Sequence, residues 1–136
     1  MCLIIKENTQ KLVATEPVRV YKLVLLSNNP PYNEYTYQIG LNTPLTKPEK
    51  EPEDKVGEGY LHAYTDKYCA LWAGRTLNRI GYPRDDFKVI EMYIPAGTTY
   101  YLNPIEHMIA AEALEWRPES EVYVEEEYMG DEDLPF

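Results

Sequence analysis

The sequence has few of the residues that build disulfide frameworks or metal centres. Its 136 residues include two cysteines, Cys2 and Cys69, and two histidines, His62 and His107. Two thiols are too few for a disulfide scaffold or a structural zinc site, and the histidines lack the close spacing of common zinc motifs. The sequence contains no Walker A loop, no dinucleotide-binding glycine loop and no nucleophile elbow. We therefore predict no metal site and no resident cofactor.

Positive charge and long apolar runs are also scarce. The chain has 13 Lys and Arg residues against 23 Asp and Glu residues, which gives a net charge of −10. This balance disfavours direct binding to a phosphate backbone. No apolar run approaches the roughly 20 residues of a membrane span, and MCLIIK does not have the form of a signal peptide. We expect a cytoplasmic protein that contacts neither nucleic acid nor membrane.

Tyrosine is abundant, with 13 residues against two each of Phe and Trp. Tyrosine combines apolar area with a polar tip, so it suits half-buried sheet faces and binding surfaces. Between Glu119 and Asp133 there are eight acidic residues and no Lys or Arg. Such a run is typical of a solvated tail or of a segment that binds a basic partner. We predict one folded domain at 1–118 and an acidic C-terminal tail at 119–136.

Hydrophobic periodicity predicts an α+β fold. Residues 18–26 (VRVYKLVLL) and 87–94 (FKVIEMYI) have the alternation and β-branched content of strands. A helix is predicted over about 66–80, with Thr65 or Asp66 as its cap. Its expected core-facing stripe is Cys69, Trp72, Ala73, Leu77 and Ile80. The fold class is a single domain with a mostly antiparallel sheet packed by one main helix.

Three other segments receive definite predictions. Residues 32–41 are expected to form an amphipathic strand that places on one face the side chains of Tyr35, Tyr37, Ile39 and Leu41. Residues 9–11 are expected to form a turn, and residues 43–58 a charged, proline-rich loop.

The stretch 105–116 is open between helix and strand. Asn103, Pro104 and Glu106 have the form of an N-cap, a proline at the first helical position and a capping glutamate. The residues that follow have helical propensity, yet a strand also suits the layout. We favour a helical turn at 104–107 followed by a strand.

Four segments of the chain follow one another in an order that resembles the ADP-ribosyltransferase fold. They are VRVYK, GYLHAYTDKYCALWA, VIEMYIPAGTTYY and IEHMIAAEALE. HAYT stands where that fold carries Ser-Thr-Ser, and the segment IEHMIAAEALE has no Glu-x-Glu pair. The resemblance implies an NAD-dependent enzyme that would use Arg19, Tyr64 and Glu106.

A second resemblance rests on MCLIIK, VRVYKLV, GYLHAYT and IPAGTTYY. These words are similar to those of small uncharacterised proteins of bacteriophages and their hosts. This resemblance implies a phage-type accessory or anti-defence factor in the host-cell cytoplasm, which would inhibit a host protein or sequester a nucleotide-derived ligand.

Three functional hypotheses follow. The first is a non-catalytic binding protein for a host protein or a nucleotide-type molecule, with homo-oligomerisation left open. The second is an enzyme similar to ADP-ribosyltransferases, and the third is an acidic nucleic-acid mimic that blocks a nucleic-acid-binding protein. For the first, the expected ligand face consists of Arg19, Tyr35, Tyr37, Tyr60, His62, Tyr64 and Thr65.

Overall fold

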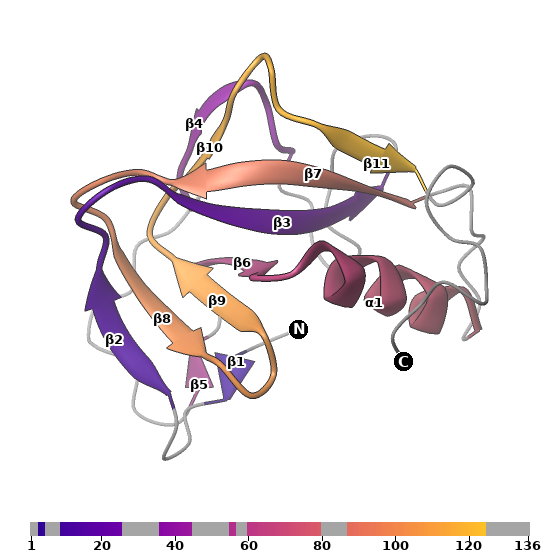
Figure 1. The fold of residues 1–136 in the computed structure, drawn as a ribbon, viewed down its shortest axis with the longest axis horizontal. Coiled ribbons are helices and arrows are strands. Elements are labelled where there is room, and N and C mark those ends of the chain that lie inside the picture. The colour runs from indigo at the N-terminus through magenta and orange to yellow at the C-terminus, as the bar shows by residue number, and fades with distance from the viewer. Residues whose placement is uncertain are drawn as a thin grey trace.

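The computed structural model describes residues 3–4, 9–25, 36–44, 55–56, 60–79 and 87–124. They form one α+β domain with a nine-stranded sheet, a separate two-stranded sheet and the helix α1, Lys67–Arg79 (Figure 1). The strands are β1 Leu3–Ile4, β2 Gln10–Val13, β3 Val18–Leu25, β4 Gly40–Asn42, β5 Lys55–Val56, β6 Leu61–Tyr64, β7 Phe87–Ile94, β8 Thr99–Asn103, β9 Met108–Ala111, β10 Leu114–Trp116 and β11 Val122–Val124.

The large sheet is built around the pairing of β3 with β7. These two strands pair along their whole length, from Val18 opposite Ile94 to Leu25 opposite Phe87. The strand order is β2-β8-β9-β6-β3-β7-β10-β4, with β11 also on β7, and the pairs are antiparallel. The strands β2, β8 and β9 run at a large angle to β3 and β7, so the sheet is strongly curved (Figure 1).

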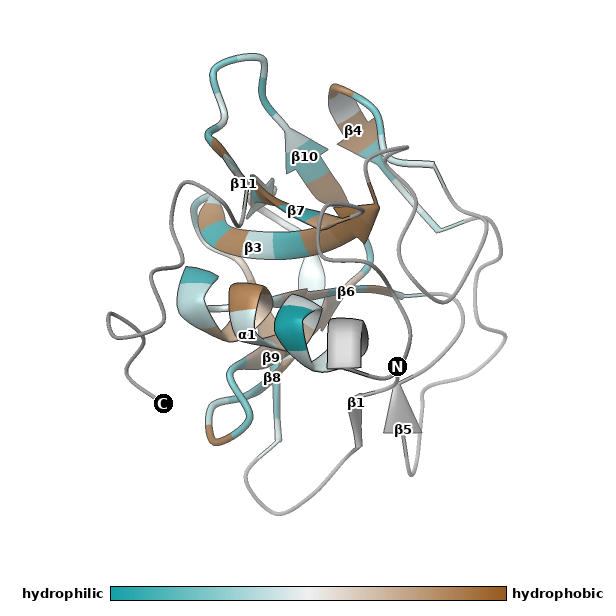
Figure 2. Ribbon diagram, turned by 90° about the vertical axis from the view of Figure 1, so that its right-hand side faces the viewer, coloured by the Kyte–Doolittle hydropathy of each residue, from teal (hydrophilic) through white to brown (hydrophobic). Residues whose placement is uncertain are grey.

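Alternating side chains give this sheet two different faces. The inner face carries the main core, which includes Val20, Val24, Ile90, Met92, Ile94, Ile109 and Leu114. The outer face is covered in part by α1, which packs over Leu23, Phe87 and Val89. Hydrophilic and hydrophobic residues alternate along β3 and β7 (Figure 2), as expected for strands whose successive side chains point to opposite faces.

The predicted helix is confirmed, but its predicted core-facing stripe is wrong at Trp72. The Asp66 carboxylate caps the helix by accepting a hydrogen bond from the Tyr68 amide at 2.7 Å. The residues that pack on the sheet are small or compact, since Ala70, Leu71 and Ala73 are buried while Trp72 is 45% exposed. A Cβ added at Gly74 would lie 3.2 Å from Leu23 Cδ1, so the helix is too close to the sheet to fit an indole between them.

The predicted strand at 32–41 is confirmed at Gly40 and Leu41 and is wrong at 36–39. β4 begins only at Gly40, which has a φ of +110°. The Asn42 side chain bonds to the backbone N–H and C=O of Gln38 at 3.0 and 2.9 Å, so a local turn replaces a ladder there. As a result Tyr37 is buried, whereas Ile39 and Leu41 are 58% and 59% exposed. Tyr35 lies outside the described residues.

Two further segments differ from expectation. The turn predicted at 9–11 is wrong, because Gln10–Val13 is a strand that pairs with β8. The predicted loop at 43–58 contains the two-residue strand β5, which pairs with β1. Both strands are short, and β2 is only weakly apolar, which explains why periodicity does not reveal them.

The turn at 104–107 followed by a strand is confirmed. The Asn103 side-chain oxygen accepts hydrogen bonds from the amides of Ile105 and Glu106 at 3.1 and 3.2 Å. The strand β9 then starts at Met108. Further along, β11 places Val122–Val124 of the acidic segment in the sheet, while residues 125–136 lie outside the described part. The described part of the chain holds no helix with the length and apolarity needed to cross a membrane.

Replacing Gly74 by valine is expected to destabilise the domain by about 1–3 kcal/mol. The added methyl groups would press on Leu23 and Phe87, which pack against this side of the helix. Urea unfolding followed by circular dichroism measures the effect. Thr76→Val, on the same helix, is the matched control and is expected to change stability by less than about 0.5 kcal/mol. A Gly74→Val protein as stable as the wild type would contradict the close packing.

Candidate functional site

Beyond the helix, the outer face carries a row of side chains that crosses four strands. In register, Arg19 on β3 lies opposite Tyr93 on β7, Tyr93 lies opposite Glu115 on β10, and Glu115 lies opposite Leu41 on β4. Directly opposite residues of antiparallel strands have Cβ atoms about 5 Å apart, so these four residues lie next to one another across the sheet. We call Arg19, Tyr93, Glu115 and Leu41 the exposed row.

Charged and aromatic contacts hold this row in place. The Arg117 guanidinium lies 3.8 Å from the Tyr93 ring centroid, and its Nε contacts the Glu115 carboxylate at 2.9 Å. The Tyr93 hydroxyl donates a hydrogen bond to Glu91 at 2.9 Å. The Arg19 guanidinium lies 3.9 Å from the same Glu91 carboxylate, and the Arg19 side chain is 61% exposed. Tyr93 is thus clamped between a cation on its ring and a carboxylate on its hydroxyl.

A second row lies beside the first. Tyr21 on β3 is opposite both Glu91 on β7 and Tyr64 on β6. The Tyr21 ring also contacts the Tyr123 ring, with centroids 6.2 Å apart. Burial raises the pKa of Tyr21, and the carboxylates of Glu91, Asp66 and Glu121 add to the rise while Arg19 opposes it. The rows therefore join into one aromatic and charged surface.

The phenols of this surface act as hydrogen-bond donors. The hydrogen bond to Glu91 raises the pKa of Tyr93, with smaller contributions from burial and from the charge of that carboxylate. Burial, together with the hydrogen bond to Glu121, raises the pKa of Tyr123 strongly. Because phenols with raised pKa values stay protonated at neutral pH, they do not serve as general bases. The arrangement is suited to binding through stacking and charge.

Four residues of the predicted ligand face lie at or beside β6. Tyr64 on β6 lies opposite Tyr21 on β3, and Tyr21 is two residues from Arg19 on the same face of β3. Tyr21 therefore links Tyr64 to Arg19. Tyr60 makes an edge-on contact with the Tyr101 ring at 5.7 Å. His62 is half-buried on β6, and Thr65 donates its amide to the His107 carbonyl at 2.8 Å.

Tyr37 of the predicted face does not lie with them. It packs in the core of the inner face, on the opposite side of the sheet from Tyr64. Tyr35 lies outside the described residues. The residues proposed from sequence as one face are therefore divided between the two sides of the sheet.

Glu106, predicted for the transferase hypothesis, lies in the β8–β9 turn. The bond between Thr65 and His107 holds this turn against the junction of β6 and α1. His107 has a φ of +55°, so the backbone adopts a left-handed conformation next to that bond. Among the residues that the structure describes, no three His, Cys, Asp or Glu side chains group in a way that could hold a metal ion.

Sequence reasoning missed Glu91, Tyr93, Glu115 and Arg117, although part of the signal was present. Period-two alternation along 18–25 already separates Arg19 and Tyr21 from Val20 and Val24. The same alternation along 87–94 places Glu91 and Tyr93 on one face. Which strands pair, and in which register, is set by tertiary structure and gave no local signal.

The inner face contains one unusual residue, the buried lysine Lys22. Its side chain leaves β3 between those of Val20 and Val24, and the residue is 8% exposed. The Nζ atom donates a hydrogen bond to the His62 carbonyl at 2.5 Å and lies 5.3 Å from the Tyr37 ring centroid. Burial lowers the pKa of Lys22 to about 7.

Comparisons with models of known protein families, with curated proteins and with solved structures found no match. The binding surface proposed below is therefore argued from the geometry of this chain.

The pKa of Lys22 predicts that stability rises with pH above neutrality. The folded state releases the proton near pH 7, whereas the unfolded chain keeps it up to about pH 10.5, so the unfolded state binds more protons between these values. The wild type should gain about 2–3 kcal/mol from pH 6.5 to pH 9 relative to Lys22→Met. Urea titrations at several pH values measure this difference.

The exposed lysine of β2 provides the control for that experiment. Lys11→Met should keep the pH dependence of the wild type, because Lys11 is exposed. If Lys22→Met and the wild type show the same slope, Lys22 is not buried as described.

Proposed function

We propose that this chain is a non-catalytic binding protein that docks on a partner protein through the exposed row. The observation that carries the proposal is the clamped Tyr93, with Arg117 over its ring, Glu91 on its hydroxyl and Arg19 opposite it on β3. Such a group is ordered before binding, so less conformational entropy is lost when a partner arrives.

The composition of the row supports a protein partner. Tyrosine and arginine are the residues most often found, with tryptophan, among the dominant contacts of protein interfaces. Leu41 extends the same row with an apolar side chain that is 59% exposed. The charged groups around Tyr93 can orient a bound partner, and the Tyr93 ring and Leu41 provide apolar surface that the partner can bury.

The net charge and the resemblance to small phage proteins indicate which kind of partner and role to propose. A net charge of −10 favours encounter with a basic surface, and Arg19 and Arg117 add two cations that can pair with acids on the partner. We assign the role of an accessory or inhibitory factor that acts on a host protein in the host-cell cytoplasm. NAD and other cofactors have no part in this role.

Tyr93→Ala is expected to weaken partner binding at least about tenfold, because it removes the ring that holds Arg117 and orients Glu91. A pull-down from bacterial lysate identifies the partner, and isothermal titration calorimetry with the purified partner gives the dissociation constants.

Two variants make this test specific. Arg19→Glu, in the same row, should also weaken binding, whereas Lys11→Glu on β2, a separate strand at the sheet edge, should leave the dissociation constant unchanged. Equal binding by the wild type, Tyr93→Ala and Arg19→Glu would refute the exposed row as the docking surface.

One observation favours a second candidate, an enzyme similar to ADP-ribosyltransferases. The Thr65–His107 bond brings the turn that carries Glu106 to the junction that follows Tyr64. In this reading Arg19 would orient the phosphates of NAD and Glu106 would stabilise positive charge on the ribose.

NAD consumption tests the second candidate directly. The wild type should hydrolyse or transfer ADP-ribose from NAD, and Glu106→Gln should reduce the rate at least about a hundredfold, as loss of an electrostatic stabiliser does. Glu119→Gln, an exposed acid in the turn before β11, is the control. A wild-type protein that consumes no NAD removes this candidate.

A further inference from the structure

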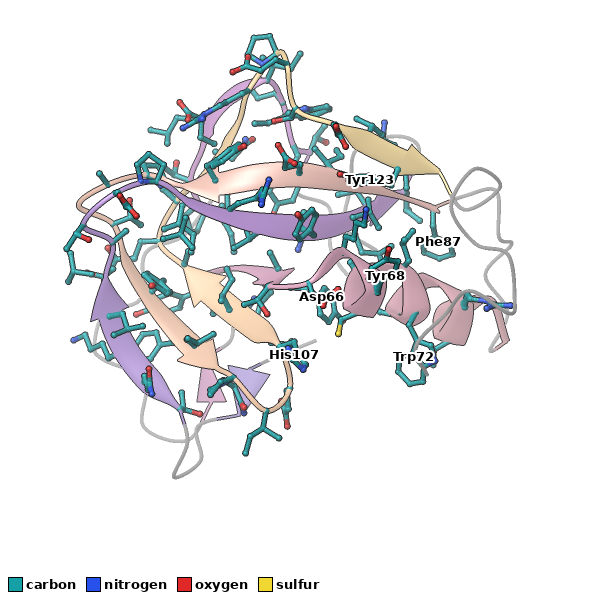
Figure 3. The ribbon with its side chains drawn as sticks, in the orientation of Figure 1. Asp66, Tyr68, Trp72, Phe87, His107 and Tyr123 are labelled. Carbon is teal, nitrogen blue, oxygen red and sulfur yellow. The ribbon has the colours of Figure 1, made fainter. Side chains whose placement is uncertain are left out.

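A lysine side chain of this chain already lies against two tyrosine rings. The Lys67 Nζ atom is 5.3 Å from the Tyr68 ring centroid and 4.9 Å from the Tyr123 ring centroid. Both distances are within the roughly 6 Å at which a cation is attracted to the face of an aromatic ring. Tyr68 extends from the first turn of α1, which lies below Tyr123 in the view of Figure 3. We call Tyr68 and Tyr123 the tyrosine pair.

Lys67 follows the capping residue Asp66 at the N-terminal end of the helix. It is the first residue of α1, and the first turn contains no acidic residue. The N-terminal end of a helix carries partial positive charge, so a cation is disfavoured at this position. The contact with the two rings is one of the interactions that hold the Lys67 ammonium at this position.

The surroundings of the tyrosine pair favour a cation. The Tyr123 hydroxyl donates to the Glu121 carboxylate at 2.5 Å, which increases the electron density of the ring. The Asp66 carboxylate binds the amide of Tyr68 next to Lys67. Tyr123 is 4% exposed and Tyr68 is 37% exposed, so the site is shielded on one side and open on the other. A partly desolvated cation–ring contact is worth more than an exposed one.

We propose that the tyrosine pair is a binding site for a lysine ammonium of the partner protein, and that Lys67 occupies it until the partner displaces it. This inference rests on the proposed function, because it names one chemical group of that same partner. The net charge of −10 agrees with a lysine-bearing partner surface. Since Lys67 competes for the site, its removal should increase the affinity for an external ammonium.

The probes are acetyl-lysine-methylamide, with a free side-chain ammonium, and the same compound with a trimethylated side chain. Ring chemical shifts of the carbon-13-labelled tyrosines are followed by NMR during titration, with sodium chloride titrations at equal ionic strength to remove screening effects. Lys67→Gln should show saturable shifts at Tyr68 and Tyr123, with a dissociation constant at least about threefold lower than that of the wild type. Addition of Tyr68→Leu to this variant should abolish the shifts.

The variants separate the possible outcomes. Lys67→Gln loses the two ring contacts and also removes a charge that the helix dipole disfavours, so it should still fold, and Lys11→Gln is the matched control for loss of one positive charge. Binding of the trimethylated probe alone assigns the site to methylated lysine. No saturable shift with either probe in folded Lys67→Gln overturns the inference. The proposed function is tested separately, because it depends on Tyr93 and Arg19 and survives if only this experiment fails.

Discussion

The pairing of β3 with β7 is the constraint on which the other features depend. The two strands pair over eight residues each. Their register therefore determines, for all sixteen side chains, which face of the sheet each one lies on. Slipping β3 by one residue against β7 would turn Val20 toward solvent and Arg19 into the core. The apolar inner core therefore determines where the charged surface can lie, and the binding face follows from the same ladder that holds the domain together.

The outer face is divided by the short helix that covers one end of this ladder. Small residues of α1 pack on Leu23, Phe87 and Val89, so that end of the ladder is apolar. The other end of the ladder, beyond the N-terminal end of the helix, carries on its outer face the side chains of Arg19, Tyr21, Glu91 and Tyr93. Lys67 and Tyr68 lie at this boundary, where an aromatic surface is half-covered and charges of both signs are close. The two binding proposals concern neighbouring parts of one surface but depend on different residues.

The sequence predicted the features that depend on local pattern. The strands at 18–25 and 87–94, the helix at 67–79 and the Asn103-capped turn all follow from alternation, capping and propensity, and all are confirmed. Trp72 and Tyr37 were placed wrongly, because helix-to-sheet distance at Gly74 and the turn made by Asn42 are tertiary effects. Of the residues of this surface, the sequence predicts only Arg19 and Tyr64 as binding residues, because a strand's own sequence does not determine which strands pair with it.

The separation of β3 and β7 along the chain affects how the protein is made. During synthesis β3 emerges first, and β4, β6 and α1 all follow before β7 is available to pair with it. Until then the apolar side of β3, with Lys22 among its valines, has no long partner strand, and contacts between distant segments form slowly. A nascent chain of this protein is thus expected to expose the apolar side of β3 until β7 has been synthesised, and its yield should depend on chaperone capacity more than that of a helical domain of equal size.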